Sequence, residues 1–349
     1  MYRYEPIEGP PLAELAECLN LAFSDYYLPV RLNESALAGI CKASRVDEKL
    51  SFAAFQGEQM VGALLHSRGI YRGKTVLFDV AAGVIPEHRG KKVFTNLFSF
   101  AEQEARRQGV EACCLEVLQQ NEKAIALYQK VGFSICRESV VLRADDSCPT
   151  SSASRPVEFT NYEPFPFQRE AGGYYPLPSY EHSDDVIRHN PELYGVAFVK
   201  REVAPAYCVY AKADGRIIQM GCQNIEDLEA ILRNLLMRYG SVTAKNIDAG
   251  ERAILELFGR LGFKEVARQF EMEKRIVPEE VQKGAEAFAS APFCDLQGIQ
   301  DKNEMLCLPF GSFVNFQIVK HPDERWTVMV HNATASGVQS VNSFHLFGG

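Results

Sequence analysis

The sequence predicts an α/β protein with a mixed (α+β) sheet, arranged as two tandem domains and a C-terminal extension. Apolar runs typical of strands alternate with amphipathic runs typical of helices through residues 1–143. A weaker set of the same elements occupies residues 158–276. Its segment 257–263 echoes segment 127–133, which indicates an internal repeat. Residues 144–157 are polar and contain serine and proline, a composition typical of a linker, and residues 277–349 form the extension.

Size and composition agree with this division. A chain of 349 residues is too long for one ordinary domain and suits two. Its 46% hydrophobic and 23% charged residues are ordinary for a globular protein. The formal charge of −8 argues against a general affinity for nucleic acid or for anionic membranes, and it permits a cationic amine as substrate.

Cysteine usage and the N-terminus predict a cytoplasmic protein. The ten cysteines include no C-x-x-C pair, and the adjacent Cys113 and Cys114 are interpreted as small buried hydrophobic residues. Residues 1–5 lack the apolar core of a signal peptide, and no apolar run approaches the ~18 residues of a membrane span. We therefore expect neither a membrane nor a nucleic-acid partner.

Start signals and periodicity assign the elements of the first domain in order. A helix begins after Pro10-Pro11, and Asn33 caps a second one that ends near Ala43. Glycine-containing turns separate the next three strands. The expected strands are 2–7, 50–55, 60–67, 74–85, 111–117 and 135–142. The helices are 12–23, 34–43, 93–108 and 121–131, with Val93, Leu97, Phe98, Phe100 and Ala101 on the buried face of the third.

Two stretches of the first domain carry recognisable chemistry. Residues 84–94 read V-I-P-E-H-R-G-K-K-V-F, which is a strand end, a proline and a basic, glycine-containing loop that opens a helix. Free backbone N–H groups and the positive end of the helix dipole meet there, so a phosphate is the natural ligand. Residues 121–133 read N-E-K-A-I-A-L-Y-Q-K-V-G-F, in which a strand end delivers Asn121 and Tyr128 follows two helical turns later.

Together the two stretches resemble the acetyl-CoA site of the GNAT N-acetyltransferase superfamily, whose pattern is V-x-P-x-x-R-G-x-G-x-G/A followed by N-x-x-A-x-x-L-Y-x-x-x-G-F. The resemblance covers residues 2–143 and implies a GNAT fold in each tandem domain. It departs at Lys92 and Phe94, where the family has small residues that let the backbone approach a pyrophosphate. The matching positions are Val84, Pro86, Arg89, Gly90, Asn121, Ala124, Leu127, Tyr128, Gly132 and Phe133.

The resemblance implies acetyl-CoA as co-substrate and assigns the residues that hold it. The amides of the loop 89–94 bind the pyrophosphate, helped by the neighbouring positive charges. The backbone at the strand end pairs with the pantetheine amides, and Asn121 bonds the pantetheine arm. The expected cofactor-binding residues are Val84, Ile85, Arg89, Gly90, Lys91, Lys92, Val93, Phe94 and Asn121.

Two residues are candidates for catalysis. Tyr128, a phenol with a usual pKa of ~10, is matched to a thiolate leaving group of ~8.5 and is the expected general acid; the alternative is a core residue. Asp79, on the strand that leads to Val84, is the candidate base if burial raises its pKa. It is equally consistent with a partner on a neighbouring strand, and a water chain can replace a side-chain base. The seven histidines show no metal-ligand spacing, so we expect no metal.

Two aromatic segments are candidates for the acceptor side. Residues 23–31 include Tyr26 and Tyr27, and the corresponding GNAT segment often lines the acceptor groove; a packed connector is the alternative. Residues 159–180 are rich in tyrosine, phenylalanine and proline and form either a cleft wall or a loop packed over a sheet.

The second domain is expected to be degenerate. Phe258 stands where Tyr128 stood, Gly250 or Glu251 replaces Asn121, and residues 221–224 contain no basic glycine loop. This copy should therefore not hold CoA. The expected helices are 183–189, 227–239 and 251–261, and the strands are 193–200, 206–211, 216–221, 242–247 and 264–273. In the extension, a helix is expected at 281–290 and a hairpin at 313–319 and 326–331.

The predicted function is an N-acetyltransferase that moves an acetyl group from acetyl-CoA to the amine of a small-molecule or peptide acceptor, by direct transfer in a ternary complex. One alternative is a non-catalytic acyl-CoA-binding or regulatory module, and another is a transferase for a different acyl group. The sequence specifies neither the acceptor nor the oligomeric state.

Overall fold

The computed structural model describes residues 1–8, 11–27, 30–145, 155–163, 173–201 and 205–277, and three strands between residues 314 and 346. The chain divides into two compact units, Met1–Gln282 and Lys283–Gly349. Most of the expected linker, Phe165 and Phe167 of the 159–180 segment and the expected helix at 281–290 lie outside the described residues.

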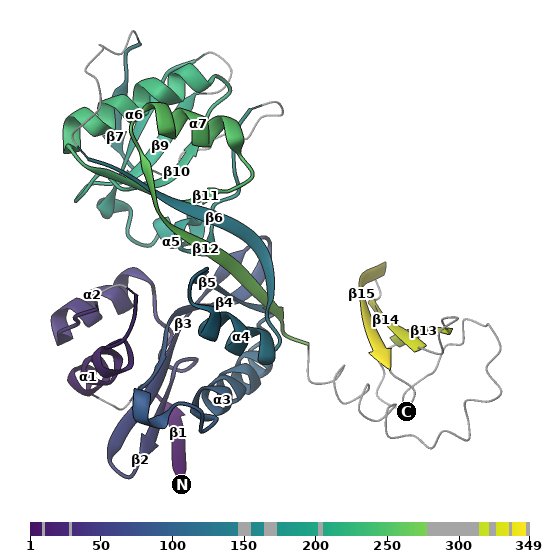
Figure 1. The fold of residues 1–349 in the computed structure, drawn as a ribbon. Helices are drawn as coiled ribbons and strands as arrows, with labels where there is room; N and C mark the ends of the chain where they lie inside the picture. The colour runs from purple at the N-terminus through teal and green to yellow at the C-terminus, as the bar shows by residue number, and fades with distance from the viewer. Residues whose placement is uncertain are drawn as a thin grey trace. The chain divides into compact units, whose positions relative to one another are not determined.

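The first half of the larger unit has the element order that the sequence predicts (Figure 1). The turn between β3 and β4 and the caps of the helices fall where glycine and asparagine signal them. The elements are β1 Tyr2–Pro6, α1 Leu12–Ala22, α2 Glu34–Ala43, β2 Phe52–Gln56, β3 Gln59–Tyr71, β4 Lys74–Val84, α3 Val93–Arg107, β5 Ala112–Leu118, α4 Glu122–Lys130 and β6 Ser134–Ala144.

The second half repeats this order, with the one short helix α5 in place of α1 and α2. The strand β7 was not predicted, since its four residues are too few to show a period. The elements are β7 Glu158–Asn161, α5 Asp184–Ile187, β8 Tyr194–Val199, β9 Ala206–Ala211, β10 Ile217–Gly221, α6 Ile225–Tyr239, β11 Val242–Asp248, α7 Arg252–Arg260 and β12 Lys264–Arg275, with single 3-10 turns at Pro86–His88, Tyr180–His182 and Pro191–Leu193.

The twelve strands described in the larger unit form one mixed sheet, in which the two halves exchange their last strands. The order is β1-β2-β3-β4-β5-β12-β6-β11-β10-β9-β8-β7. Strand β12 of the second half lies between β5 and β6 of the first, and β6 lies between β12 and β11 of the second. Every residue of β5 has a partner on β12. Neither half therefore completes its own sheet.

The internal repeat is confirmed, and it is regular in its C-terminal part. Ala112 at the start of β5 corresponds to Val242 of β11, and residues 122–130 of α4 correspond to residues 252–260 of α7, a constant separation of 130 positions. The ring of Phe133 lies edge-on to Tyr128 with centroids 5.5 Å apart. The ring of Phe263 lies in the same way against Phe258, at 4.7 Å.

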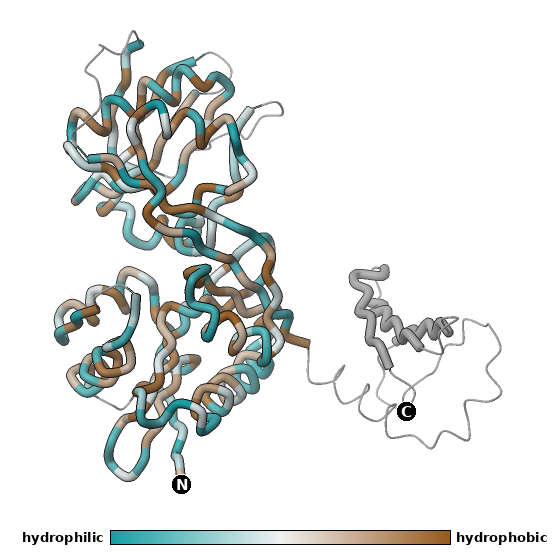
Figure 2. Tube along the Cα trace, viewed as in Figure 1, coloured by the Kyte–Doolittle hydropathy of each residue, from teal (hydrophilic) through white to brown (hydrophobic). Residues whose placement is uncertain are grey.

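Helices cover both faces of the first half of the sheet. Figure 1 shows α1 and α2 on one side of strands β1–β4 and α3 and α4 on the other. Along α3, hydrophobic and hydrophilic residues alternate with the helical period (Figure 2). The expected buried face of α3 is correct except for Phe100. This residue is 44% exposed and stacks on Tyr4 at the margin of the core.

The smaller unit contains an antiparallel three-stranded sheet. Its strands are β13 Val314–Lys320, β14 Trp326–Thr334 and β15 Gly337–Leu346, in the order β13-β14-β15. The predicted hairpin is confirmed, and β15 extends it by a strand that the sequence analysis did not assign.

The exchanged strands predict that the two halves fold together. A chain of residues 1–282 is expected to unfold in one cooperative transition, whereas residues 1–150 alone leave the β12 position vacant and expose unpaired edges on β5 and β6. Urea unfolding followed by circular dichroism and by amide hydrogen exchange tests this. A monomeric 1–150 fragment as stable as the longer chain would contradict it.

Candidate active site

The strands β4 and β5 separate part-way along their length. They pair in parallel at three positions only, which end at Phe78 with Cys114. Beyond them β4 continues along β3, with a register shift at Val80, and β5 continues along β12. Asp79 is the first residue past the last pair. The carboxyl end of the sheet therefore contains an opening whose edges are backbone.

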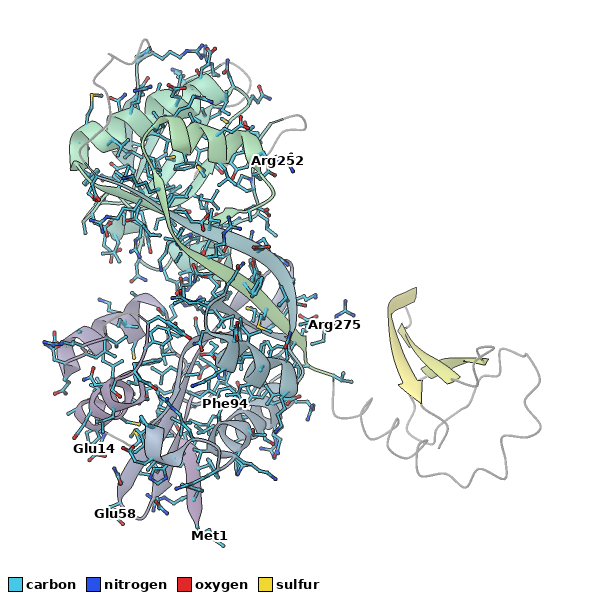
Figure 3. All side chains as sticks on the ribbon, in the orientation of Figure 1. Met1, Glu14, Glu58, Phe94, Arg252 and Arg275 are labelled. Carbon is cyan, nitrogen blue, oxygen red and sulfur yellow. The ribbon has the colours of Figure 1, made fainter. Side chains whose placement is uncertain are left out.

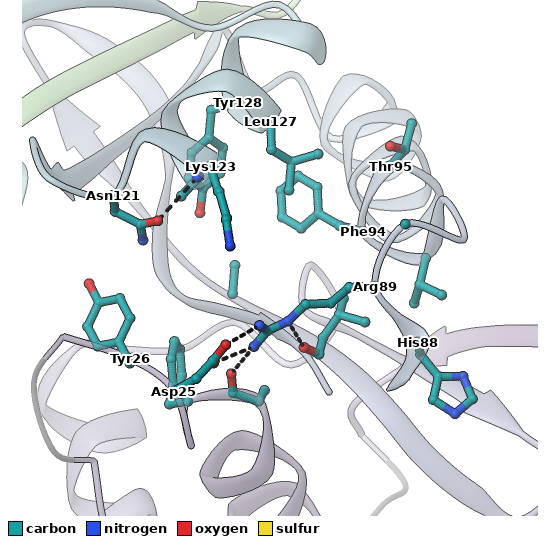
Figure 4. A pocket seen from close by; sticks show the side chains of 18 of the residues that line it. Asp25, Tyr26, His88, Arg89, Phe94, Thr95, Asn121, Lys123, Leu127 and Tyr128 are labelled. Carbon is teal, nitrogen blue, oxygen red and sulfur yellow. Dashed lines mark hydrogen bonds and ion pairs between the residues drawn. The ribbon is translucent and has the colours of Figure 1, made fainter. Parts of the chain in front are cut away.

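A cavity of about 460 Å³ lies at this opening (Figure 4). Four segments line it: the connector after α1, the end of β4, the loop into α3 and the first two turns of α4. Both motifs, residues 84–94 and residues 121–133, contribute side chains to the lining. The lining includes Ala22, Phe23, Asp25, Tyr26, Tyr27, Ala82, Gly83, Val84, Arg89, Gly90, Lys92, Val93, Phe94, Thr95, Asn121, Lys123, Ala124, Leu127, Tyr128 and Lys130.

The loop into α3 presents an unoccupied helix N-terminus to the cavity. Gly90 has a φ of 73° and Lys92 a φ of 63°, so Lys92 adopts the left-handed conformation that glycine favours. Within the part of the chain that the structure describes, no side chain caps α3, and its first turn contains no acidic residue. The first amides of a helix have no partner within it, and they carry the positive end of its dipole. This end of α3 is therefore suited to an anion.

Arg89 braces the loop instead of extending into open space. Its Nη atoms donate to both carboxylate oxygens of Asp25, at 2.6 and 2.8 Å, and to the carbonyl of Ala22 at 2.8 Å. Its Nε donates to the carbonyl of Val84 at 3.0 Å. The hydrogen bond from Arg89 lowers the pKa of Asp25, which is a partner that the sequence analysis did not identify. The guanidinium thus ties the strand end and the loop to the connector after α1.

Val84 and Ile85, which were expected to bind the cofactor through their backbone, direct their backbone groups to opposite sides of the strand. Ile85 donates its N–H to the carbonyl of Val61 on β3, at 3.0 Å. Because successive residues of a strand direct their backbone groups to opposite sides, Val84 faces the opening. Its carbonyl is taken by Arg89, which leaves the N–H of Val84 at the edge of the cavity.

Asn121 is the N-cap of α4, where its Oδ1 accepts a hydrogen bond from the N–H of Ala124 at 3.3 Å. This leaves its amide nitrogen on the side of the cavity (Figure 4). Lys123 extends into the cavity from the same helix, and Lys130 also lines it. The sequence analysis did not assign either lysine to the site, although both lie within the motif at residues 121–133.

Tyr128 and Asp79 form a direct pair. The Tyr128 hydroxyl donates to Oδ2 of Asp79 at 2.8 Å. Burial raises the pKa of Asp79 to about 7, although the hydrogen bond from Tyr128 acts in the opposite direction. Burial and the neighbouring Asp79 raise the pKa of Tyr128 well above its usual value. Asp79 is not among the described residues that line the cavity, so it reaches the cavity through Tyr128.

Phe94 packs inward from the first turn of α3. Its ring lies edge-on to Tyr128, with centroids 5.4 Å apart, and beside Phe98 at 6.3 Å. It is 8% exposed and belongs to the core of the first half (Figure 3). The side chain at this glycine or alanine position of the pattern therefore supports the wall that carries Tyr128.

The connector after α1 closes one side of the cavity. Tyr27 donates its hydroxyl to the carbonyl of Gln120 at 2.8 Å, and Tyr26 lies edge-on to both Phe23 and Tyr27. The connector approaches β4 closely at Gly83, where a Cβ would lie 2.7 Å from that of Ala22. Both candidate tyrosines thus lie at the cavity, together with the connector that Arg89 holds.

The described residues of the second half form none of these features. Three residues, 222–224, join β10 to α6, where eight residues, 85–92, join β4 to α3. Asn224 caps α6 with its side chain, and the first turn contains Glu226 and Asp227, which pair with Arg155 and Arg201. The helix terminus that would receive an anion is already occupied by side-chain oxygens.

Other residues fill the position of the cavity in the second half. Tyr174 exchanges two backbone hydrogen bonds with Cys222, at 2.7 and 2.8 Å, beside the end of β10. Phe258, fully buried, replaces Tyr128, and the stretch of β10 that corresponds to Asp79 carries Ile217 and Ile218. A small cavity, about 30 Å³, lies between β10 and β11.

Comparison with known proteins identifies a family match in the first half of the chain. Residues 13–133 match the acetyltransferase (GNAT) family. The segment 13–133 therefore belongs to the GNAT superfamily. A stretch of 90 residues is 28% identical to N-alpha-acetyltransferase 30 of Schizosaccharomyces pombe. This match covers 26% of the chain and 59% of the length of that relative.

Solved structures resemble the chain in fold, including its tandem arrangement. A tandem GNAT protein from the clavulanic acid biosynthesis pathway aligns with 80% of this chain and 100% of its own, at 12% identity and a TM-score of 0.56. A GCN5-related N-acetyltransferase from Sphaerobacter thermophilus aligns with 79% of this chain and 96% of its own, at 15% identity and a TM-score of 0.56. The chain therefore has two GNAT-like halves with a mixed α/β sheet, as the sequence predicts.

Neither a metal cluster nor a membrane span is found in the part of the chain that the structure describes. No group of three or more histidine, cysteine, aspartate or glutamate side chains is placed there to hold an ion. None of the described helices is both long enough and apolar enough to cross a bilayer.

The raised pKa of Asp79 predicts a pH-dependent gain in stability for Asp79→Asn. In the unfolded chain this carboxyl ionises near ~3.9, whereas in the folded protein it ionises at about 7. Between these values the unfolded state binds fewer protons, so the stability of the wild type falls as the pH rises through the window. Asparagine removes this loss, and its amide oxygen still accepts from Tyr128.

Urea unfolding at pH 5 and pH 8 tests this. The gain from Asp79→Asn is expected to be larger at pH 8 by on the order of 2 kcal/mol. A gain that is equal at the two pH values, or larger at pH 5, would show that Asp79 ionises normally.

Proposed function

We propose that the chain is an N-acetyltransferase that moves the acetyl group of acetyl-CoA to the amine of a small-molecule or peptide acceptor. The proposal rests chiefly on one observation: a single cavity is lined by the uncapped end of α3, by the end of β4 beyond its last pair with β5, and by Tyr128. These are a site for a diphosphate, a slot for an amide-bearing arm and an acid for a leaving thiolate. None of the three is found among the described residues of the second half.

In this proposal the loop 89–94 receives the diphosphate of CoA through its backbone amides. The free N–H groups at the start of α3 supply hydrogen bonds, and the helix dipole favours the negative charge. Lys92, Lys123 and Lys130 line the same cavity and add positive charge. Arg89 contributes indirectly, by holding the loop through Asp25 and the carbonyl of Val84.

The pantetheine arm would lie in the opening between β4 and β5. It is an extended chain with two amides, and it can pair with an open strand edge as a further strand would. The N–H of Val84 and the amide nitrogen of Asn121 are the donors nearest this path. The arm would thus deliver the thioester to Tyr128.

Transfer then occurs directly between the two bound substrates. The neutral amine attacks the thioester carbon, the carbon–sulfur bond breaks and the electron pair passes to sulfur, which takes a proton from the Tyr128 hydroxyl. The attacking nitrogen loses its proton to water. Holding both substrates in one cavity makes the attack effectively unimolecular, which removes much of the entropic barrier.

Amines of peptide N-termini are a reasonable first class of acceptor. The curated relative from Schizosaccharomyces pombe is an N-alpha-acetyltransferase, and the family match covers residues 13–133, which carry the cavity. The connector with Tyr26 and Tyr27 would contact the acceptor, because it borders the cavity opposite α3 and α4.

Acetyl transfer is tested by incubating the protein with radiolabelled acetyl-CoA and a panel of free-N-terminal peptides, polyamines and aminoglycosides. Tyr128→Phe is expected to lower turnover by about 100-fold. Its affinity for acetyl-CoA should remain close to that of the wild type, since the ring and its packing on Phe94 are kept. Equal turnover in this variant would remove the acid role. Binding without turnover on every amine would favour an acyl-CoA-binding module.

Lys92→Gly tests whether this residue acts through its backbone or through its charge. Since Lys92 already has a glycine-like conformation, glycine is expected to leave the affinity for acetyl-CoA within about threefold of the wild type. Lys91→Gly removes the same charge from the neighbouring position and is the matched control. A loss of tenfold or more that is confined to Lys92→Gly would make its ammonium group a phosphate ligand.

A further inference from the structure

We propose that Asp79 is a proton-relay residue that resupplies, through Tyr128, the proton that the leaving thiolate takes up. The inference rests on the proposed acetyl transfer and adds a residue to it. Asp79 touches neither substrate in this scheme, so it acts only through the tyrosine hydroxyl.

The geometry suits a relay better than it suits a base for the amine. Asp79 lies on β4 at the first position past the last β4–β5 pair, and Tyr128 lies on α4, between Asp79 and the cavity. Their oxygens are 2.8 Å apart, a distance at which a proton can pass in either direction. The described lining of the cavity includes Tyr128 and excludes Asp79.

The pair is isolated from other charges. Among the ion pairs of the described residues none includes Asp79, and Tyr128 is the one side chain that bonds its carboxyl group. The titratable groups that face the pair are Tyr26 on the connector, which raises the pKa of Tyr128, and Cys113 on β5, whose own pKa is raised by Asp79. Neither brings a positive charge. The protonation of Asp79 is therefore governed by its burial and by Tyr128.

The pKa values of Tyr128, Asp79 and the leaving thiol explain why a relay would help the transfer. The pKa of Tyr128 lies well above its usual value, so proton transfer from the tyrosine alone to a thiolate of ~8.5 is unfavourable. The pKa of Asp79 is raised to about 7, below that of the thiol. A concerted shift from the carboxylic acid through the phenol to sulfur is therefore favourable, and no tyrosinate has to persist.

The proton balance closes without any further reactant. As the carbon–sulfur bond breaks, the O–H bond of Tyr128 breaks and an S–H bond forms. The protonated carboxyl of Asp79 gives its proton to the phenol oxygen and becomes a carboxylate. The proton lost by the attacking amine goes to water, and the carboxylate regains one from solvent before the next turnover. The sum is amine plus acetyl-CoA giving amide plus CoA thiol.

The second half supports a joint role for the two residues. Tyr128 is replaced there by Phe258, and the position of Asp79 falls within Ile217 and Ile218. In the second half, apolar residues thus replace both members of the pair. The N-terminus of α6 in that half is capped by Asn224 and has Glu226 and Asp227 in its first turn. If the carboxyl group of Asp79 served only to hold α4 on the sheet, it could be present in the second half even without an anion site there.

A double-mutant cycle with pH profiles tests the relay on the full chain. The variants are Asp79→Asn, Tyr128→Phe and the pair together, with the radiolabelled acetyl-CoA assay as readout. Asparagine keeps the oxygen that accepts from Tyr128 and removes the transferable proton. We expect Asp79→Asn to lower kcat by about 10–100-fold with KM for acetyl-CoA unchanged, and the double variant to be no slower than Tyr128→Phe.

The pH profile separates a relay from a structural role. Wild-type kcat is expected to fall above pH ~7 as Asp79 ionises, and this alkaline limb should vanish in Asp79→Asn. Glu116→Gln is the matched control, because burial raises the pKa of that carboxyl to about 8 but it bonds Asn246 instead of Tyr128. Additive losses, or a limb that vanishes in Glu116→Gln and persists in Asp79→Asn, would overturn the proposal.

A second measurement holds even if no acceptor is turned over. In protein labelled with carboxyl-¹³C aspartate, the NMR signal lost in Asp79→Asn is expected to titrate near pH 7. Its midpoint should rise in Tyr128→Phe, since the hydrogen bond that lowers the pKa of Asp79 is removed. A midpoint below 5 would overturn the relay. Failure of acetyl transfer with this titration intact would instead overturn the proposed function.

Discussion

The site depends on the pairing of β5 with β12 along its whole length. A strand between two neighbours can leave one of them only if the other holds it, because unpaired backbone groups are costly when buried. All seven residues of β5 pair with β12, so β4 can separate from β5 after three paired positions. The opening that would receive pantetheine therefore rests on a strand from the other half of the chain. The second half therefore has a structural role in the site of the first half.

The two halves share one frame and differ in electrostatics at one helix end. The first leaves the N-terminus of α3 free, with a long basic loop before it. The second places a cap and two acids at the N-terminus of α6 and shortens the loop to three residues. Anion binding at a helix terminus requires that its amides be available. The loss of this site can therefore be read from local residues, without reference to the overall fold.

Much of the fold was predictable because its signals are local. Periodicity gave nearly all the helices and strands of both halves, and segments 127–133 and 257–263 disclosed the repeat. The exchange of β6 and β12 was not predictable, since nothing local distinguishes a strand that completes its own sheet from one that completes its neighbour's. The same holds for Asp25, whose role depends on a distant Arg89. Asp79 was identified as a candidate, but only the fold could place it behind Tyr128.

The central claim is that one half binds the cofactor and the other does not. Calorimetric titration of the full chain with acetyl-CoA tests it most directly, with an Asn121→Ala, Arg89→Ala double variant and Asn224→Ala, the cap of α6, as the matched change in the second half. The account predicts one site per chain, lost in the double variant and unchanged in Asn224→Ala. Two sites per chain, no binding by the wild type, or binding that only Asn224→Ala removes would contradict it.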